Sequence, residues 1–222
     1  MALRLALLTL GFDLKFQLRT LSRLGGEIDK VVIVKPEDVS EKSRRAEEEL
    51  VEFVKEILGL KVDVIRLKVE DPGEAIASLY SYLMKEMPSR VIADVSGGMR
   101  ALILEVLAAL MNALPLERVK LIIWTENLKT RLEMCPRVFS LPQLDELSVK
   151  ILSVLSDGAP RRLKELTVNV GYPKTTVFTK LKKLAERGLV YERREKPGIK
   201  YVITDTGKIA LKLVQSKKRR RV

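Results

Sequence analysis

The sequence has 222 residues, with 41 Lys or Arg, 29 Asp or Glu, one cysteine and no histidine. This composition excludes Ser-His-Asp and Cys-His catalysis, histidine metal sites, zinc fingers and any internal disulfide of Cys135. An apolar content of 46% is enough for packed cores, and the lone cysteine favours a reducing, cytoplasmic setting. We expect no metal and no cofactor.

Two apolar runs stand out in the sequence, and neither predicts a membrane protein. The run at residues 2–8 is short, is interrupted by Arg4 and is followed by no cleavage motif, so it is not typical of a signal peptide. The longest apolar stretch, residues 101–116, contains Glu105 and Pro115 and is too short to span a bilayer. We therefore expect a protein without a membrane partner.

The excess positive charge lies entirely after residue 140. Residues 1–140 contain 21 basic and 21 acidic side chains, whereas residues 141–222 contain 20 and 8. A small domain with so one-sided a charge favours a polyanionic partner, and nucleic acid is the default candidate. The sequence therefore predicts two domains, 1–140 and 141–222, with different partners.

Residues 1–140 alternate between apolar runs and amphipathic stretches, which predicts a parallel, doubly wound α/β sheet. The expected strands are residues 3–9, 31–34, 61–67, 90–95 and 119–124. The expected helices are residues 13–24, 41–58, 71–87 and 97–113, and Ile57 is expected on the buried face of the second. Residues 130–134 and 137–141 are expected to form a pair of antiparallel edge strands.

In the common strand order 3-2-1-4-5, the first and fourth strands are neighbours, and ligands bind beyond their carboxyl ends. Two unusual loops follow these two strands: Thr9-Leu10-Gly11-Phe12 and Ser96-Gly97-Gly98-Met99-Arg100. Glycines let the backbone approach a ligand, and the helix that begins at the second loop offers unpaired N–H groups to an anion. Ser96 adds a hydroxyl and Arg100 a guanidinium fork. The alternative is a tight turn with Arg100 in a surface ion pair.

The motifs of common nucleotide enzymes are missing. The first turn lacks G-x-G-x-x-G, although Glu37 or Asp38 stands where a ribose-binding acid would lie, and there is no G-x-x-x-x-G-K-[ST] motif. Asp94 has no second carboxylate placed beside it by sequence, which favours a structural role. The pattern indicates binding of an anionic ligand, a nucleotide, more than turnover. A redox sensor with a nicotinamide cofactor is a less favoured alternative.

Residues 141–222 have the pattern of a winged helix. Helices are expected at residues 143–156, 163–170 and 173–187, and a hairpin at residues 189–191 and 200–203 with a Lys196-Pro197-Gly198 turn. Thr204 begins a last helix, and residues 217–221 form a basic tail. Hydroxyls and lysines on the third helix suit the major groove of DNA.

The basic and hydroxyl side chains of this domain are the candidate DNA contacts, although a solvated helix face is the alternative interpretation. The candidates are Arg161, Arg162, Lys174, Thr175, Thr176, Thr179, Lys180, Lys183, Arg193, Arg194, Lys196 and Lys200. Because one winged helix buries a modest interface, binding of an operator in double-stranded DNA predicts a dimer.

The sequence resembles a family at three places along the chain. Leu8-Thr9-Leu10-Gly11-Phe12, the Asp94-Val95-Ser96-Gly97-Gly98-Met99-Arg100 loop and the downstream winged helix together resemble CRISPR-associated transcriptional regulators. These regulators join a CARF (CRISPR-associated Rossmann-fold) domain to a MarR-like winged helix. The resemblance covers nearly the whole chain and implies a regulator of CRISPR-Cas genes.

The resemblance also implies how the ligand is bound. It implies a homodimer whose CARF domains meet across a two-fold axis and share a pocket for a cyclic oligoadenylate. Cyclic tetra-adenylate is the ring that the resemblance favours. Residues 9–12 would cradle the ring and residues 96–100 would hold its phosphates. Some relatives cleave such rings, so a slow phosphodiesterase in which Arg100 stabilises phosphate charge is the alternative to a regulator without enzymatic activity.

Overall fold

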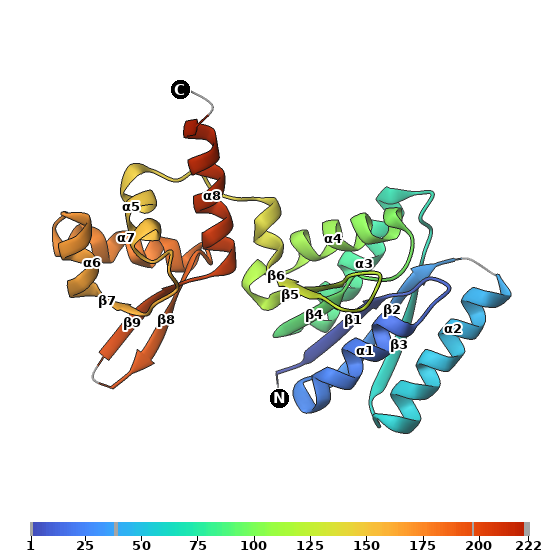
Figure 1. Cartoon of the computed structure of the whole chain (residues 1–222). Helices are drawn as coiled ribbons and strands as arrows, with labels where there is room; N and C mark the ends of the chain where they lie inside the picture. Colours follow the sequence, from blue (N-terminus) through green and yellow to red (C-terminus); the bar gives the residue numbers. More distant parts are fainter. Residues whose placement is uncertain (1, 38–39, 197, 220–222) are drawn as a thin grey trace. The chain divides into compact units, whose positions relative to one another are not determined.

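The computed structural model describes residues 2–37, 40–196 and 198–219. The chain divides into two compact units, Met1–Pro136 and a second unit that begins at Arg137. Figure 1 shows the helices and strands of each. Within the described ranges, no helix is both long enough and apolar enough to cross a membrane.

The first unit is built on a six-stranded sheet with the order β3-β2-β1-β4-β5-β6. Its strands are β1 (Arg4–Thr9), β2 (Lys30–Pro36), β3 (Lys61–Leu67), β4 (Arg90–Asp94), β5 (Val119–Trp124) and β6 (Arg131–Met134). Strands β1 to β5 are parallel and β6 is antiparallel to β5. The predicted strand order is confirmed, and β1 and β4 are neighbours at the point where the winding reverses.

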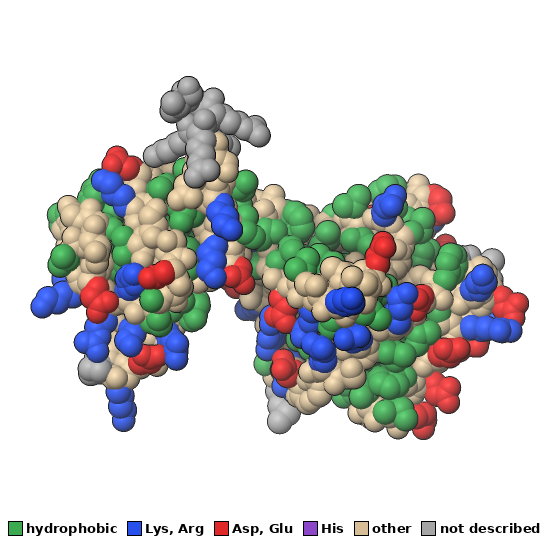
Figure 2. All heavy atoms as spheres, viewed as in Figure 1, with side chains coloured by type: hydrophobic (Ala, Val, Ile, Leu, Met, Phe, Trp, Pro, Cys, Tyr) green, Lys and Arg blue, Asp and Glu red, His purple; other side chains and the backbone are tan. Residues whose placement is uncertain are grey.

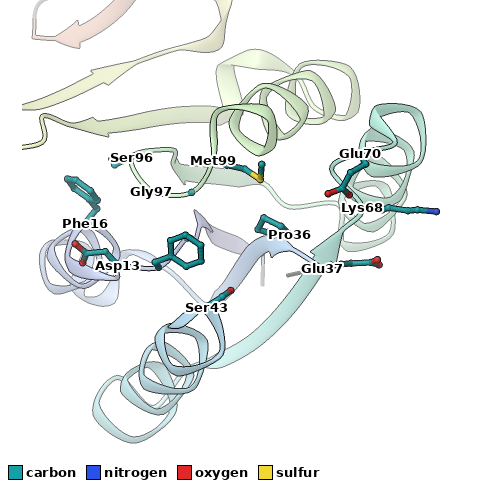
Figure 3. A pocket seen from close by; sticks show the side chains of 13 residues that line it. Asp13, Phe16, Pro36, Glu37, Ser43, Lys68, Glu70, Ser96, Gly97 and Met99 are labelled. Atoms are coloured by element: carbon teal, nitrogen blue, oxygen red, sulfur yellow. The ribbon is translucent and has the colours of Figure 1, made fainter. Parts of the chain in front are cut away.

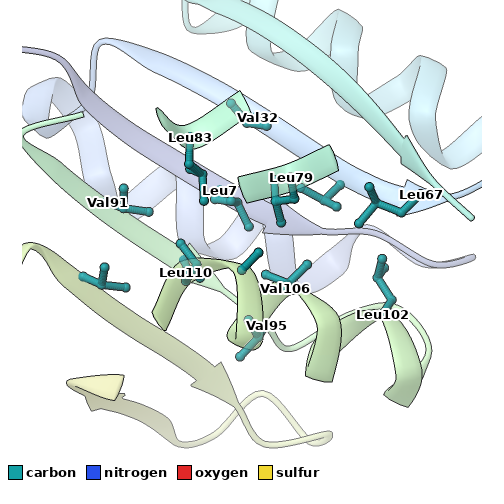
Figure 4. Close-up of a cluster of buried hydrophobic side chains, with 14 of the residues drawn as sticks. Leu7, Val32, Leu67, Leu79, Leu83, Val91, Val95, Leu102, Val106 and Leu110 are labelled. Atoms are coloured by element: carbon teal, nitrogen blue, oxygen red, sulfur yellow. The ribbon is translucent and has the colours of Figure 1, made fainter. Parts of the chain in front are cut away.

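Helices cover both faces of this sheet. They are α1 (Lys15–Leu24), α2 (Glu41–Glu52), α3 (Pro72–Glu86) and α4 (Arg100–Ala113). Successive β1 residues point to opposite faces, so Leu5 and Leu7 pack with α3 and α4, while Ala6 and Leu8 pack with α1 and α2. Figure 4 shows the first of these cores, with Leu7 among side chains from α3 and α4. The loops at the strand ends are thus carried by a rigid scaffold.

Three short helical turns complete the unit: η1 (Gly25–Glu27), η2 (Phe53–Ile57) and η3 (Leu116–Arg118). A fourth, η4 (Pro136–Phe139), starts at the last residue of this unit and continues into the second. The expectation that Ile57 faces the core is wrong, because η2 is a π-helical turn that rotates Ile57 to 70% exposure while Val54 stays buried. The predicted strand at residues 137–141 is also wrong. Pro136 has no N–H for a strand ladder, and the chain forms the 3-10 turn η4 there.

Two predicted helix starts are confirmed in atomic detail. The Asp71 carboxylate accepts a hydrogen bond from the Glu74 N–H at 3.1 Å, with Pro72 in the first turn of α3. In the second unit, the Thr204 hydroxyl accepts from the Gly207 N–H at 3.0 Å at the start of the last helix. Local capping chemistry therefore fixes where these helices begin.

The second unit has the winged-helix topology that the sequence predicts. Its elements are α5 (Glu146–Val154), β7 (Arg161–Arg162), α6 (Leu163–Val170), α7 (Lys174–Glu186), β8 (Val190–Glu195), β9 (Gly198–Ile203) and α8 (Asp205–Arg219). The strands form a sheet of order β7-β9-β8. Gly171 ends α6 with φ +71°, a left-handed conformation that favours glycine, and so allows the turn into α7. Pro197 and the side chains of the predicted tail, residues 217–221, lie outside the described part.

Candidate functional site

The two predicted ligand loops meet at the carboxyl ends of β1 and β4, where Leu8 is in register with Asp94. They approach backbone to backbone. A Cβ built on Gly11 would lie 3.1 Å from the Cα of Gly98, and Gly98 itself has φ +87°. A Cβ on Gly97 would overlap the side-chain amide of Gln17. The glycines of both loops are therefore required for close packing between the loops as well as for any ligand.

A buried hydrogen-bond network holds the second loop in place. The carboxylate of Asp94 is fully buried and accepts hydrogen bonds from the hydroxyls of Thr20 and Ser96 and, at 2.9 Å, from the Ser96 N–H. Trp124 donates its indole N–H to Thr20 and its backbone N–H to the Ser96 hydroxyl, both at 2.8 Å. The Asp94 carboxylate thus accepts three hydrogen bonds from two residues, and Trp124 in turn bonds the hydroxyls of both.

Burial raises the pKa of the Asp94 carboxyl, and the hydrogen bonds from Ser96 and Thr20 act in the opposite direction. The structural role that the sequence favours for Asp94 agrees with this enclosure. The Ser96 hydroxyl, however, already donates its proton to Asp94. In this conformation Ser96 positions the loop, and its hydroxyl proton is not directed at a ligand.

Helix α4 begins directly after this loop without a side-chain cap. Met99 occupies the N-cap position, is 48% exposed and supplies no capping hydrogen bond. The first-turn N–H groups and the positive end of the helix dipole are therefore directed at the loop region. Arg100 is exposed and forms no ion pair with any described residue, so the surface ion pair considered for it is absent there. This is the chemistry of an anion site.

A pocket of about 870 Å³ opens between the two loops and the ends of β2 and β3. Figure 3 shows its lining. Both predicted loops contribute, together with Glu37, one of the two acids considered for a ribose, and with residues that the sequence did not single out for this site. Asp38, the other acid considered, lies outside the described residues. The lining residues are Gly11, Phe12, Asp13, Phe16, Pro36, Glu37, Ser43, Lys68, Glu70, Ser96, Gly97, Gly98 and Met99.

The predicted ligand residues separate into two groups. Thr9 and Leu10 are fully buried, and the Thr9 hydroxyl donates to the carbonyl oxygen of Gly97 at 2.5 Å. Their side chains support the loops and do not reach the pocket, which revises the contact predicted for them. Phe12 is 66% exposed and lines the pocket together with the other predicted residues except Arg100.

Acidic side chains line part of the same pocket. Asp13 pairs with Lys15 at 2.8 Å, whose hydrogen bond lowers the pKa of the Asp13 carboxyl. Glu37 stands at the end of β2, and in Figure 3 Glu70 turns toward Met99 while Lys68 points outward. The pocket thus combines the helix N–H groups at the start of α4 with carboxylate acceptors that follow β1, β2 and β3. Among the described residues, no group of three or more His, Cys, Asp or Glu side chains is placed to hold a metal ion.

Helix α7 of the second unit exposes most of the predicted DNA contacts. Its buried face consists of Val177, Leu181 and Leu184. Lys174, Thr175, Thr176, Thr179 and Lys183 are all exposed. The structure thus places these five side chains on the solvent side of the helix that follows the turn, as a recognition helix requires.

Lys180 differs from the other predicted contacts on α7. Its ammonium forms an ion pair with Asp145, the N-cap residue of α5, and the Lys180 side chain is only 22% exposed. Lys180 therefore ties α7 to α5, and its role as a DNA contact stays a prediction. Lys182 was missed, although the spacing Thr175, Thr179, Lys182 places it in the centre of the exposed face. Its ammonium lies 4.8 Å from the ring centroid of Phe178.

The wing carries two kinds of basic side chain. Arg193 and Lys200 both pair with Glu195, at 2.6 and 2.7 Å, and these cations lower the pKa of its carboxyl. Arg194 and Lys196 are exposed and form no ion pair with a described residue. The free cations of the wing are therefore at and beside its tip.

The two predicted contacts of β7 lie beside the wing. Arg161 pairs with Asp157 at 2.6 Å, and Arg162 is exposed. They are in register with Tyr201 and Lys200 of β9. Strand β7, which the sequence did not predict, therefore joins Arg161 and Arg162 to the sheet of the wing.

The fold and the two candidate sites define a protein that joins a Rossmann-like domain, with a pocket where the winding of its sheet reverses, to a winged helix-turn-helix domain. Residues 4–134 match the model of the Csa3 CRISPR-associated Rossmann-like domain. This is more than half of the chain, and the protein belongs to that family. Residues 148–194 match the IclR helix-turn-helix domain. The protein is thus a CRISPR-associated regulator with a DNA-binding domain.

The winged helix has similar structures among known proteins. A MarR family protein from Bacillus stearothermophilus is 15% identical with a TM-score of 0.34, and the match covers 38% of this chain and 60% of that one. The homodimeric winged helix-turn-helix domain of Mb0332 from Mycobacterium bovis, a possible ArsR-family regulator, is 26% identical with a TM-score of 0.33. That match covers 38% of this chain and 78% of the other.

One further structure is similar over nearly the whole chain. Protein VC1899 from Vibrio cholerae is 11% identical with a TM-score of 0.45, and the match covers 98% of this chain and 68% of that one. The chain spans 60% of the length of the MarR family protein described above. No protein with curated annotation matches the sequence significantly.

Proposed function

We propose that the protein is a cytoplasmic, dimeric regulator of CRISPR-Cas genes that changes its affinity for operator DNA when its Rossmann-like domain binds a cyclic oligoadenylate. Cyclic tetra-adenylate is the first ligand to test. The observation that carries the anion-binding part is the uncapped start of α4, which lies at the pocket beside an exposed Arg100 that has no described ion-pair partner.

The rest of the pocket suits the other parts of a nucleotide. Phe12, Phe16 and Met99 offer apolar and aromatic surface to a base, and Glu37 and Glu70 offer acceptors to ribose hydroxyls and base amino groups. The carboxylates would repel a phosphate, so we infer that the phosphates lie at the α4 end. A volume of about 870 Å³ is that of an ordinary small-molecule site.

Dimerisation is supported by apolar surface beside the pocket. Phe12 is 66% exposed and Leu104, one turn after Arg100 on α4, is 67% exposed. Ala101 is exposed on the same helix, and Ala108 and Met111 are partly exposed. A second copy packed against this α4 face would cover these side chains and bring two pockets together, as a symmetric ring requires.

The change in DNA affinity requires two states of the dimer that bind the ligand with different affinity. The direction of the change, toward activation or repression, is not part of the proposal. By linkage, a ligand that strengthens operator binding is itself bound more tightly when operator is present, and the reverse holds for one that weakens it. Paired titrations of ligand with and without operator therefore test the coupling.

Isothermal titration calorimetry of the purified protein with cyclic tetra-adenylate tests the proposed ligand. We expect saturable binding with one ring per two chains, and no binding of nicotinamide adenine dinucleotide, the control ligand. Binding of the dinucleotide instead would move the pocket to the redox-sensor alternative. Binding of neither would refute the proposed ligand and leave the DNA-binding domain as the supported part.

The proposed dimer face is tested by sedimentation analysis of Leu104→Glu. We expect a dimer for the unchanged protein and a monomer for this variant, because a charge at the centre of the contact is left without a partner. Ile57→Glu, at the similarly exposed position on η2, is the matched control and should remain a dimer. A dimeric Leu104→Glu protein would place the contact elsewhere.

We infer that the ring is bound and not cleaved. The support is local: the Ser96 hydroxyl donates to Asp94, and the Asp94 carboxylate is enclosed, so neither group is free to move a proton on a ligand. A single-turnover assay with labelled ring and excess protein tests this, with intact ring as the expected result. Linear product would favour the slow phosphodiesterase, in which Arg100 and the α4 N–H groups stabilise phosphate charge.

A further inference from the structure

Helix α1 carries a row of cations on one side. Lys15, Arg19 and Arg23 stand at i, i+4 and i+8, so they lie above one another along the helix. Like charges at this spacing destabilise a helix, which makes the row a cost to the fold. Figure 2 shows Lys and Arg side chains gathered over this part of the first unit. Residues 1–140 as a whole carry no net charge.

Two of these cations are held over one aromatic ring. The guanidinium carbon of Arg19 lies 5.0 Å from the ring centroid of Trp124, and that of Arg23 lies 4.9 Å from it. The ring is itself fixed, because its N–H donates to Thr20 at 2.8 Å. Both guanidinium groups are therefore positioned before any partner arrives, which reduces the entropy lost on binding.

Arg19 and Arg23 form no ion pair with any residue in the part of the chain that the structure describes. Other arginines of the unit do, such as Arg4 with Asp29 at 2.6 Å and Arg45 with Glu41 at 2.5 Å. Lys15 also has a partner in Asp13. The positive charge available to a partner on this helix is therefore that of the two arginines.

Arg131, opposite Trp124 in the β5–β6 pairing, adds a third cation to the region. Its guanidinium contacts Glu133 at 2.7 Å, and Glu133 also accepts from Lys120 at 2.7 Å. The charge of Arg131 also acts on Asp94, where it opposes the rise in the carboxyl pKa that burial causes. Asp94 is fully buried. Among the described residues, no exposed acid of this region is thus bound to the two arginines on α1.

We propose that Arg19 and Arg23 form a second DNA-contacting surface, on the Rossmann-like domain, that binds the phosphate backbone without sequence preference. The proposal rests on DNA binding by the winged helix. Guanidinium forks match phosphate oxygens, and an i, i+4 pair separates them by about 6 Å along the helix axis. A row of cations along a helix suits an extended row of phosphates better than a small anion.

The test compares two double variants of the full-length protein. Arg19→Gln/Arg23→Gln keeps the side-chain stems that pack beside Trp124 and removes both charges. Arg44→Gln/Arg45→Gln, on α2, is the matched control: it removes two charges whose partners are Glu48 and Glu41. Fluorescence anisotropy with a duplex that contains no operator, over a range of salt concentrations, measures the contacts.

We expect the slope of log affinity against log salt to fall by about 2 for the α1 variant and to stay unchanged for the α2 control, because each lost phosphate contact removes about one unit. Arg19→Lys/Arg23→Lys should restore most of the slope. Equal slopes for the α1 variant and the unchanged protein would overturn the proposal. So would an equal fall in both variants, which would indicate only long-range attraction.

Two further measurements separate this proposal from other failures. Urea unfolding of the α1 variant shows whether its fold is intact; if it is not, each single Gln variant is titrated in the same way. Calorimetry with cyclic tetra-adenylate should be unchanged by the α1 variant. A protein that binds no ring but keeps the α1 effect on the salt slope would contradict the proposed ligand alone.

Discussion

Gly11 and Gly98 pack backbone against backbone at the carboxyl ends of two neighbouring parallel strands, so that a Cβ on Gly11 would lie 3.1 Å from the Cα of Gly98. The two loops are therefore expected to move together. A ligand that moves the Ser96–Arg100 segment must also move the Thr9–Phe12 segment. This contact gives the clearest test of whether the pocket depends on both loops.

Gly11→Ala should weaken ring binding and leave operator binding by the ligand-free protein unchanged. The added methyl group has to displace the backbone of Gly98, which should weaken the free energy of ring binding by about 1–3 kcal/mol. Calorimetry measures the ring affinity. Gly26→Ala, where the methyl group meets no atom within 4 Å, is the control and should bind normally. Normal binding by Gly11→Ala would mean that the loops separate freely.

Arg100→Ala should lower ring affinity by about 1.5–3 kcal/mol, the usual contribution of a hydrogen bond to a charged group. Operator binding in the absence of ring should be unaffected, since Arg100 lies on α4, outside both the winged helix and the proposed DNA-contacting surface on α1. Arg118→Ala, which removes another exposed arginine of the same unit, is the matched control. Loss of both ring and operator binding in Arg100→Ala would contradict a division of labour between the domains.

Lys182→Ala and Lys180→Ala should have different effects. Lys182 lies in the exposed face of α7, so its loss should weaken DNA binding and reduce the salt slope by about 1. Lys180 is paired with Asp145, so its loss should lower thermal stability more than the salt slope. Fluorescence anisotropy with DNA measures the salt slope of each variant, and thermal unfolding measures its stability. The opposite pattern would favour Lys180 as the DNA contact.

The stability of the second unit should depend on acid pH through Asp145. Hydrogen bonds, first from Lys180 and then from Ser148, lower the pKa of its carboxyl to about 2. Because an unfolded Asp titrates near pH 3.9, the stabilisation is complete above about pH 4 and is lost as the pH falls toward 2. Unfolding curves of Asp145→Asn and the unchanged protein should differ at pH 7 and converge near pH 2.

Asp205→Asn is the control for this pH dependence, since Asp205 opens α8 and its side chain is 79% exposed. Its unfolding curves should follow those of the unchanged protein at every pH. A constant difference between Asp145→Asn and the unchanged protein from pH 7 to pH 2 would show that the Asp145 charge does not carry the effect.

Thr20→Val should lower the free energy of unfolding of the first unit by about 1–3 kcal/mol, because it leaves the buried Trp124 N–H and one oxygen of Asp94 without their partner. Urea denaturation followed by the fluorescence of Trp124, the sole tryptophan, measures it. Ser22→Ala removes an exposed hydroxyl from the same helix and should have little effect. A stable Thr20→Val protein would mean that the network is not needed for folding.

The predictable part of this protein is the part written in local patterns. The alternation of apolar runs and amphipathic stretches predicted the sheet order, and Gly97 and Gly98 marked the loop after β4. The charge difference between the two parts of the chain likewise indicated the DNA-binding domain. These signals are local because periodicity reports which face of one element is buried.

The pairings across the fold followed only from the tertiary structure. Thr20 reaches Asp94 over 74 residues and Trp124 over 104, and Lys180 reaches Asp145 over 35. No pattern within a helix or strand specifies such partners. Two outcomes were local but were still not predicted: the Ser96 hydroxyl donates to Asp94 two residues away, and the π-helical turn η2 exposes Ile57. Local sequence thus determined the elements and the place of the site, whereas long-range packing decided which side chains remain free to act there.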